Sequence, residues 1–247
     1  MDLFFQNRIQ VRVLEPDPRH VIWYAGIPAL IQALITRQIF DTDNYHTSLG
    51  MVNELFKKED FAFALLSREE INQINRFKAL KKQIEWMAGR FLAKQMLAHF
   101  FFAGTPLDCI SLDYLEQGAP FCVQKPGLNF SLSHSGTYTA CALARQPGTR
   151  PGVDLEKISA APDTAFLTTA FTPEENRHMG NDPARIFTGW TLKEAFLKYI
   201  RKGFNESLQQ VEVLPGGIFH RGRKAAVDTF STRIGETYIL SMVTGPG

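Results

Sequence analysis

The segment at residues 190–198 has residue types and a spacing that suit the handling of charged ligands. It reads Trp-Thr-Leu-Lys-Glu-Ala-Phe-Leu-Lys. On a helix, which turns about 100° per residue, Glu194 and Lys198 lie on one side together with Trp190 and Arg201. Glu194 and Lys198 form either an ordinary i, i+4 surface pair or part of a partly covered groove that holds charge for a ligand. The other side predicts a core-facing stripe of Leu192, Ala195, Phe196 and Tyr199.

A second acidic cluster occurs at residues 152–156, which read Gly-Val-Asp-Leu-Glu. In a strand the two apolar side chains face one side, and Asp154 and Glu156 face the other. Two neighbouring carboxylates repel each other unless they are exposed to solvent or joined to a cation. Magnesium is usually held by one or two carboxylates, with phosphate oxygens and water completing its shell. The sequence leaves both alternatives open, and Glu194 could complete a metal site as a third carboxylate.

A third constellation lies at residues 129–143, Asn-Phe-Ser-Leu-Ser-His-Ser-Gly-Thr-Tyr-Thr-Ala-Cys-Ala-Leu. Serines alternate with apolar residues up to His134, which predicts a strand, and an apolar strand resumes at Tyr138. We expect a hairpin turn over residues 134–137, with Gly136 supplying backbone freedom. His134 is either a plain turn residue or part of a phosphate site, since hydroxyls, backbone N–H groups and an imidazole can converge on an anion.

Taken in order, these motifs resemble those of a known enzyme family. The Ser-His-Ser turn, the Gly-Val-Asp-Leu-Glu strand, Phe-Thr-Pro-Glu-Glu at 171–175 and the 190–198 segment are similar to the 4'-phosphopantetheinyl transferases of the surfactin-synthetase-activating (Sfp) type. The resemblance is strong from Phe130 to Phe204, and residues 1 to about 60 match poorly. Their order and spacing are more specific than any single motif.

The resemblance implies an activity and a fold. Members of the family transfer the phosphopantetheine arm of coenzyme A to a serine of an apo acyl or peptidyl carrier protein, and adenosine 3',5'-bisphosphate leaves. The implied fold class is α+β, with two similar α/β halves forming a pseudo-dimer and the active site between them. We therefore expect halves at residues 1–145 and 146–247, an insertion near 36–60, and a monomer.

The resemblance also implies a metal-centred active site. Asp154, Glu156 and Glu194 would hold a magnesium ion that grips the pyrophosphate of coenzyme A, and Lys198 would lie against the phosphates. Phosphoryl transfer depends mainly on positioning and on neutralising charge, which suits these residue types. Glu194 is either a metal ligand or the base that receives the serine proton, and the sequence does not separate the two assignments.

Further residues carry over as coenzyme A contacts. Ser133 and His134 would face the 3'-phosphate and nearby phosphate oxygens, and Arg90 would be a basic contact on the coenzyme A side. Lys193 matches the lysine of the family's helix and would reach a phosphate or the carrier. Arg201 stands where the family usually has glycine, and it either makes another phosphate or carrier contact or extends the helix by one turn.

The composition is compatible with this interpretation. The chain has 247 residues, 45% of them hydrophobic, which is enough for a substantial core. A formal net charge of +2 and the lack of a basic run argue against nucleic acid. Three cysteines without a framework pattern favour a reducing compartment, the cytoplasm. The longest apolar run, residues 21–35, is too short for a membrane span and follows no basic leader, so we expect neither a membrane anchor nor a signal peptide.

The N-terminal region is less informative. Residues 11–13 and 21–24 predict strands, and residues 28–37 predict a short amphipathic helix. The insertion near 36–60 has an aromatic and acidic content that favours a packed extra layer over a partner-docking surface.

Two other classes of protein remain as alternatives. One is a non-catalytic protein that binds coenzyme A or a nucleotide, and the other is an interaction module whose carboxylates only decorate the surface. Magnesium-dependent binding of coenzyme A excludes the module, and modification of a carrier protein excludes both.

Overall fold

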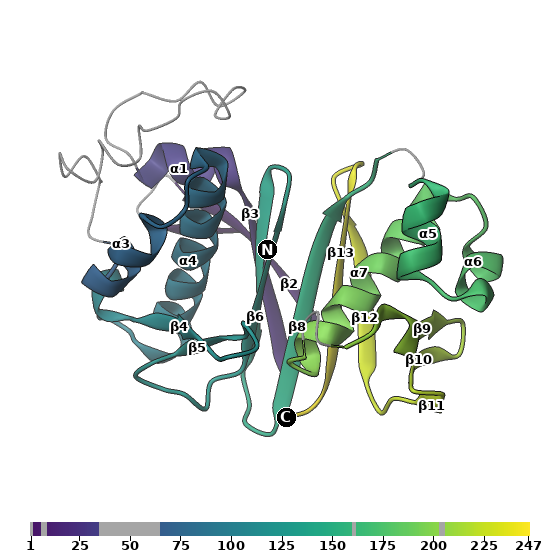
Figure 1. The fold of residues 1–247 in the computed structure, drawn as a ribbon. Helices are drawn as coiled ribbons and strands as arrows, with labels where there is room; N and C mark the ends of the chain where they lie inside the picture. Colours follow the sequence, from purple (N-terminus) through teal and green to yellow (C-terminus); the bar gives the residue numbers. More distant parts are fainter. Residues whose placement is uncertain (1, 6–8, 35–64, 160–161, 203–205) are drawn as a thin grey trace.

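The computed structural model describes residues 2–5, 9–34, 65–159, 162–202 and 206–247. Two α/β units lie side by side in it, as Figure 1 shows. The unit formed by the first part of the chain is purple to teal, and the unit formed by the last part is green to yellow. This arrangement confirms the expected α+β fold with two halves.

The first half is a five-stranded antiparallel sheet covered by helices. The strand order is β1 (Asp2–Phe5), β2 (Ile9–Asp17), β3 (His20–Gly26), β7 (Tyr138–Ala144) and β6 (Phe130–Ser135). Helices α1 (Ile27–Leu34), α3 (Arg68–Ile74) and α4 (Leu80–Phe101) lie on one side, and the small hairpin β4 (Leu112–Tyr114) and β5 (Pro120–Cys122) closes one end. The buried side chains of α4 pack on this sheet, so the helix holds a fixed position beside β6.

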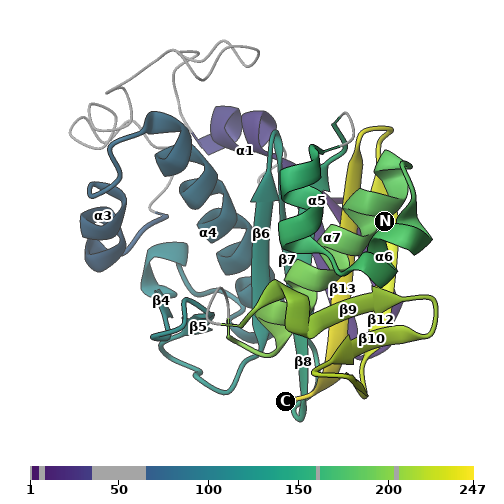
Figure 2. The same ribbon diagram turned by 45° about the vertical axis from the view of Figure 1, so that its right-hand side comes forward.

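The second half has a three-stranded antiparallel sheet in the order β12 (Asp228–Ile234), β13 (Tyr238–Pro246) and β8 (Thr149–Lys157). Helix α7 (Pro183–Tyr199) crosses this sheet, and α5 (Thr164–Ala170) and α6 (Pro173–Met179) lie outside it. Figure 2 also shows the smaller sheet of β9 (Val211–Leu214), β10 (Gly217–His220) and β11 (Arg223–Lys224). Short polar residues cap these helices, since Asp163, Thr172 and Asp182 each accept a backbone N–H in the first turn.

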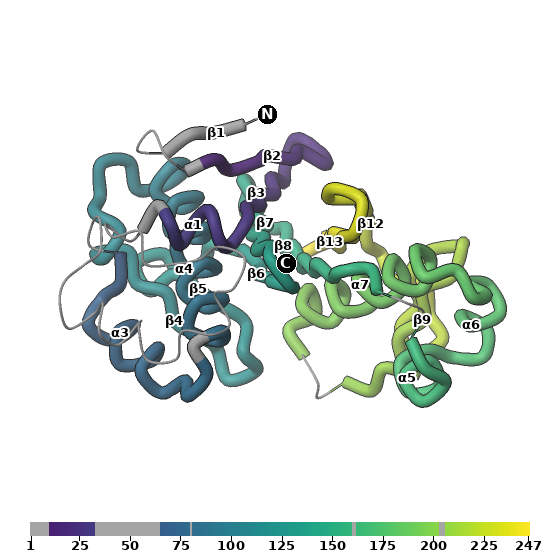
Figure 3. The backbone as a smooth tube through the Cα atoms, turned by 90° about the horizontal axis from the view of Figure 1, so that it is seen from above, coloured from purple at the N-terminus to yellow at the C-terminus, as the bar shows by residue number. Residues whose placement is uncertain are grey.

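The two halves meet where β6 and β8 run together, through a set of contacts that we call the serine rungs. Ser131, Ser133 and Ser135 of β6 each accept a backbone N–H from β8, at N···O distances of 3.0, 3.2 and 3.3 Å. The backbone N–H groups of β8 that face away from β13 therefore donate to side-chain hydroxyls. In a continuous sheet, carbonyl groups of an adjacent strand would accept them instead. Figure 3, seen from above, shows β6, β7 and β8 between α4 on one side and α7 on the other.

Most local predictions are confirmed, one is wrong, and one of the two alternatives for Arg201 is excluded. The alternation at 152–156 lies in β8, where Val153 and Leu155 are fully buried. The turn predicted over 134–137 is shorter, because β6 continues to Ser135 and only Gly136 and Thr137 join it to β7. Helix α7 ends at Tyr199 rather than gaining a turn at Arg201, which adopts a left-handed backbone with φ of 55°.

The N-terminal predictions are confirmed where the structure describes them. The two predicted strands lie within β2 and β3, and α1 covers residues 27–34. The proposed insertion near 36–60 lies outside the described residues. The expected boundary between the halves falls in the loop that joins β7 to β8. Among the helices described, none is long and apolar enough to cross a membrane.

Gly152 sets how closely α7 approaches β8, which yields a stability prediction. A Cβ at position 152 would lie 2.0 Å from the carbonyl oxygen of Ala195 and 2.5 Å from the backbone nitrogen of Tyr199. We expect Gly152→Ala to lower the free energy of unfolding by about 3 kcal/mol or more, because backbone atoms cannot move aside easily. Gly127→Ala is the matched control, since nothing lies within 4 Å of a Cβ there. Urea unfolding compares the two, and equal midpoints would contradict the close approach.

Candidate functional site

A cavity of about 280 Å³ opens between the two halves. Helix α4, the loop around the β4–β5 hairpin, strands β6 to β8 and the end of α7 all contribute to its walls. Its lining residues that bear on chemistry are Glu85, Trp86, Arg90, Tyr114, Ser133, His134, Asp154 and Lys198. The structure therefore brings five of the sequence-predicted site residues to one cavity.

Lys198 and Asp154 form the centre of this cavity wall. The Lys198 Nζ lies 2.8 Å from Asp154 Oδ1, and Asp154 is 5% exposed. The same ammonium donates to the carbonyl oxygens of Val153 on β8 at 3.0 Å and Leu132 on β6 at 3.3 Å. The Ser133 hydroxyl donates to Asp154 Oδ1 at 2.8 Å. Of the two carboxylates of β8, Asp154 is thus joined to a cation, as in the second alternative that the sequence left open.

The other two carboxylates carry raised pKa values. Burial, reinforced by the charge of Asp154, raises the pKa of Glu194 to about 7. Burial also raises the pKa of Glu156, although the Ser135 hydroxyl donates to Glu156 Oε2 at 2.7 Å and partly offsets that effect. The three carboxylates interact electrostatically with one another and with Lys198. One ammonium therefore faces three acidic groups, and the site attracts further positive charge.

The donor set suits a hard divalent cation in its chemistry. Asp154 Oδ2 and Glu194 Oε1 are buried and have no hydrogen-bond partner among the described residues. Buried carboxylate oxygens without a partner are costly, and oxygen atoms of this kind are the ligands that magnesium prefers. Among the described residues, however, no three acidic, histidine or cysteine side chains are already arranged at ligating distances. Metal binding at Asp154, Glu156 and Glu194 stays a proposal.

The hairpin serines and His134 differ in what they are free to bind. Ser133 was expected to face a phosphate, but its hydroxyl already donates to Asp154 and accepts from Leu155 N–H. Its side chain positions a carboxylate, although Ser133 also lines the cavity. His134 belongs to β6 opposite Thr139, is exposed, and lines the cavity with no hydrogen bond to its ring within the described part of the chain. His134 thus keeps both ring nitrogens available for a ligand.

Arg90 lies in the cavity wall between two aromatic rings. Its guanidinium carbon is 4.6 Å from the ring centroids of both Trp86 and Tyr114. The side chain is 1% exposed. Its Nε lies 4.0 Å from Glu70 Oε1, its Nη2 donates to Gln73 Oε1 at 3.4 Å, and its Nη1 has no hydrogen-bond partner among the described residues. The rings fix the plane of the guanidinium by cation–π contact, and its remaining donor suits an anion in the cavity.

The prediction that Lys193 reaches a phosphate or the carrier is wrong for this conformation. Lys193 is fully buried, and its Nζ lies 2.7 Å from Glu175 Oε2 and 2.6 Å from the carbonyl oxygen of Ala170. Glu175 also completes the capping box of α6 with Thr172 and accepts Val213 N–H. Lys193 therefore holds α6 and β9 against α7. The Arg201 side chain donates to Asn129 Oδ1 at 2.7 Å and does not line the cavity between the halves.

Sequence reasoning missed several residues of the site. Trp86 and Tyr114 were not recognised as partners of Arg90, and Tyr114 comes from a distant loop that no local pattern connects to α4. Ser135 could have been found, because it has the same alternating position as Ser133 on the strand. The pairing of Glu175 with Lys193 spans 18 residues and has no local signal.

Comparison with known proteins agrees with this geometry. The family model described as 4'-phosphopantetheinyl transferase superfamily matches residues 150–239. A model described as 4'-phosphopantetheinyl transferase, N-terminal, matches residues 56–146. These two ranges correspond to the two halves of the fold.

Individual relatives show modest identity. An L-aminoadipate-semialdehyde dehydrogenase-phosphopantetheinyl transferase of Xenopus laevis is 32% identical over 58% of this chain and 52% of its own length. A 4'-phosphopantetheinyl transferase of Bacillus subtilis is 27% identical over 63% of this chain and 69% of its own length. The matched segment thus spans about half of the Xenopus relative. The matched halves and the site between them show that the chain belongs to the 4'-phosphopantetheinyl transferase superfamily.

Proposed function

We propose that the protein transfers the 4'-phosphopantetheine group of coenzyme A to a serine hydroxyl of an apo acyl or peptidyl carrier protein. The serine oxygen forms a bond to the pantetheine-side phosphorus of the pyrophosphate. The bond from that phosphorus to the bridging oxygen breaks, adenosine 3',5'-bisphosphate leaves, and a base takes the serine proton. The observation that carries the proposal is the Lys198–Asp154 pair at 2.8 Å in the wall of a cavity between the halves, with the half-buried Glu156 and Glu194 close enough to interact electrostatically with it.

The side chains of the cavity divide the work. Lys198 supplies positive charge to the phosphates, and Arg90 and His134 supply donors for the other phosphate oxygens. Asp154, Glu156 and Glu194 would hold magnesium, which when bound neutralises the charge of the pyrophosphate. With a pKa of about 7, Glu194 is also suited to receive the serine proton at neutral pH.

The direct test is incubation with coenzyme A, magnesium and a panel of apo carrier proteins, read by intact mass. We expect at least one carrier to gain a phosphopantetheine group, and we expect chelation of the metal to stop the reaction. A known transferase serves as the positive control for the panel. An unmodified panel together with tight binding of coenzyme A would instead identify a non-catalytic binding protein.

Removal of a single carboxylate should stop turnover without unfolding the protein. Asp154→Ala leaves the Lys198 ammonium and the Ser133 hydroxyl without their shared partner, and Glu194→Ala removes a buried acidic oxygen. Loss of charge compensation at the pyrophosphate costs several kcal/mol, so we expect rates to fall by about a thousandfold or more. The control is Glu236→Gln, at an exposed turn. Near-normal rates for Asp154→Ala at saturating magnesium would refute this site.

His134 should act on coenzyme A rather than on the carrier protein. We expect His134→Ala to raise the KM for coenzyme A by an amount equal to about 1.5 to 3 kcal/mol, the value of a lost polar or charged hydrogen bond. With dephospho-coenzyme A, which lacks the 3'-phosphate, the defect should shrink. Steady-state kinetics with both substrates measures this difference. An equal penalty with both would reject the 3'-phosphate assignment.

The raised pKa of Glu194 predicts how stability depends on pH. Its folded pKa of about 7 lies above its ordinary value of 4.5, so the folded protein holds this proton more tightly than the unfolded chain. The contribution of Glu194 to the free energy of unfolding is complete below the pKa that Glu194 has in the unfolded chain. It is lost as pH rises through the pKa that Glu194 has in the folded protein. Glu156 shifts in the same direction. We expect metal-free protein to lose about 1 to 3 kcal/mol over this range.

Thermal unfolding with a chelator at about pH 5 and about pH 8 measures this loss. Glu194→Gln has no proton to release at this position and should show a flatter pH dependence than the parent protein. Magnesium should raise the Tm of the parent protein more at the higher pH, because it binds the ionised carboxylates. Identical pH profiles for the parent and Glu194→Gln would contradict the raised pKa.

A further inference from the structure

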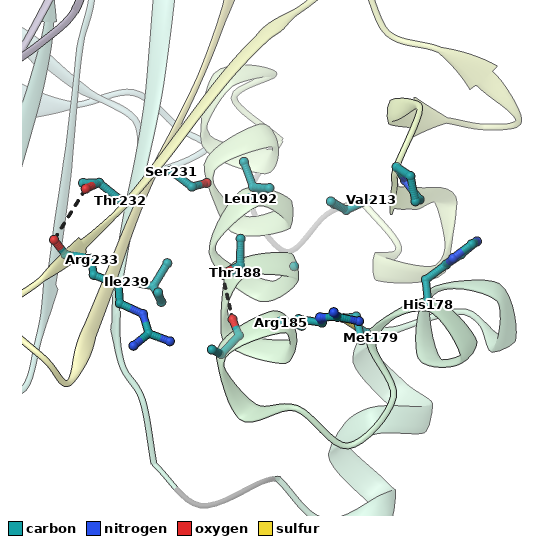
Figure 4. A pocket seen from close by; sticks show the side chains of 13 residues that line it. His178, Met179, Arg185, Thr188, Leu192, Val213, Ser231, Thr232, Arg233 and Ile239 are labelled. Atoms are coloured by element: carbon teal, nitrogen blue, oxygen red, sulfur yellow. Dashed lines mark hydrogen bonds between the residues drawn. The ribbon is translucent and has the colours of Figure 1, made fainter.

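A larger pocket, of about 550 Å³, lies in the second half on the side of α7 turned toward β12. It is bounded by α6, α7, β9, β12 and the start of β13. Figure 4 shows its side chains in close view. The residues that decide its chemistry are His178, Met179, Arg185, Leu192, Val213, Arg233 and Ile239.

This pocket is separate from the proposed active site. The two cavities share no lining residue. Arg185, Thr188 and Leu192 repeat at i, i+3 and i+7 on one face of α7, whereas Lys198 lies on the face turned toward β6 and β8. At about 100° per residue, Leu192 and Glu194 are roughly 200° apart around the helix axis. One helix therefore forms a wall of each cavity.

The pocket has cationic groups, and none of its lining residues in the described part of the chain is acidic. Arg185 belongs to α7 and Arg233 to β12. In Figure 4 their guanidinium groups lie on either side of the first turns of α7, at the end of the pocket away from Leu192. Arg185 has one surface partner, Asp182, whose Oδ2 lies 3.5 Å from its Nε. The Arg233 guanidinium has no ion pair or hydrogen bond within the described ranges. Two arginines from different elements thus retain donors for an anion.

The remaining wall is mainly apolar. Met179 and Ile239 are 7% and 4% exposed, and Leu192 and Val213 are partly buried beside them. A volume of this size falls within the range of about 300 to 1,000 Å³ that is typical of small-molecule sites. A small inorganic anion would satisfy the arginines but leave the apolar wall in water. A ligand that carries both an anionic head and an apolar chain would cover both.

We propose that this pocket binds an anionic amphiphile, with its carboxylate at the end of the pocket that carries Arg185 and Arg233 and its hydrocarbon chain along Leu192 and Val213. Planar guanidinium groups bind a carboxylate through paired N–H donors, which fixes the head of the ligand. The apolar side chains then exclude water from the hydrocarbon chain of the ligand. This site does not depend on the proposed transfer reaction, because it uses none of the residues of the first cavity.

The test uses dodecanoate as the probe and isothermal titration calorimetry on the full chain. We expect saturable binding with one molecule per chain. The double variant Arg185→Ala/Arg233→Ala should weaken binding by about tenfold or more, as expected for the loss of charge-assisted hydrogen bonds. The matched control is Arg223→Ala, since Arg223 is an exposed arginine of β11 that does not line the pocket. It should bind dodecanoate like the parent protein.

Two further measurements distinguish the contribution of the anionic head group to binding from that of the hydrocarbon chain. Dodecyltrimethylammonium has the same chain with a cationic head, and we expect no binding at the same concentration. Thr188→Phe, which places a ring in the pocket, should reduce dodecanoate binding and leave carrier modification unchanged. The proposal is overturned if the parent protein shows no saturable binding, if the double variant binds as tightly as Arg223→Ala, or if the cationic amphiphile binds equally well.

Discussion

The ammonium group of Lys198 is the interaction on which the site depends, because one cation connects three separate elements. From the end of α7 it donates to a carbonyl oxygen of β6, to a carbonyl oxygen of β8 and to the Asp154 carboxylate. These contacts hold the first half, the second half and the helix together at one point. A neutral side chain here would leave Asp154 buried beside other acidic groups without compensation, which is costly in a protein interior. Lys198 therefore both holds the two halves together and compensates the negative charge of the cavity.

The serine rungs extend this connection along the strands. Each hydroxyl accepts a backbone N–H of β8, and those of Ser133 and Ser135 use their own protons to hold Asp154 and Glu156. A hydroxyl can do both because it has one donor and two acceptor sites. Held in this way, each carboxylate has one oxygen fixed and the other available. The same residues that join the halves thus orient the acidic groups, and burial, reinforced by the charge of Asp154, raises the pKa of Glu194.

Local patterns in the sequence predicted the elements that carry the site, but not all of their contacts. Alternation placed Asp154 on the correct face of β8, and helical spacing put Glu194 and Lys198 together on α7. The role of Lys193 was not predictable in this way, because its direction is decided by Glu175 on another helix. Arg90 was placed near the ligand by family resemblance, yet its orientation depends on a tyrosine from a distant loop. The hairpin turn was predicted too long, because strand residues and turn residues look alike in a serine-rich segment.

Helix α7 explains why one half of the molecule can contain two cavities with different chemistry. Its close approach to β8, possible only because Gly152 has no side chain, presses the Lys198 side of the helix against the strands and the serine rungs. The buried Lys193–Glu175 pair holds α6 and β9 against another side of the helix. Between these fixed contacts, the face that carries Arg185 and Leu192 borders the pocket that α6, β9 and β12 also line. The helix that positions the charged groups of the first cavity is thus also a wall of the second.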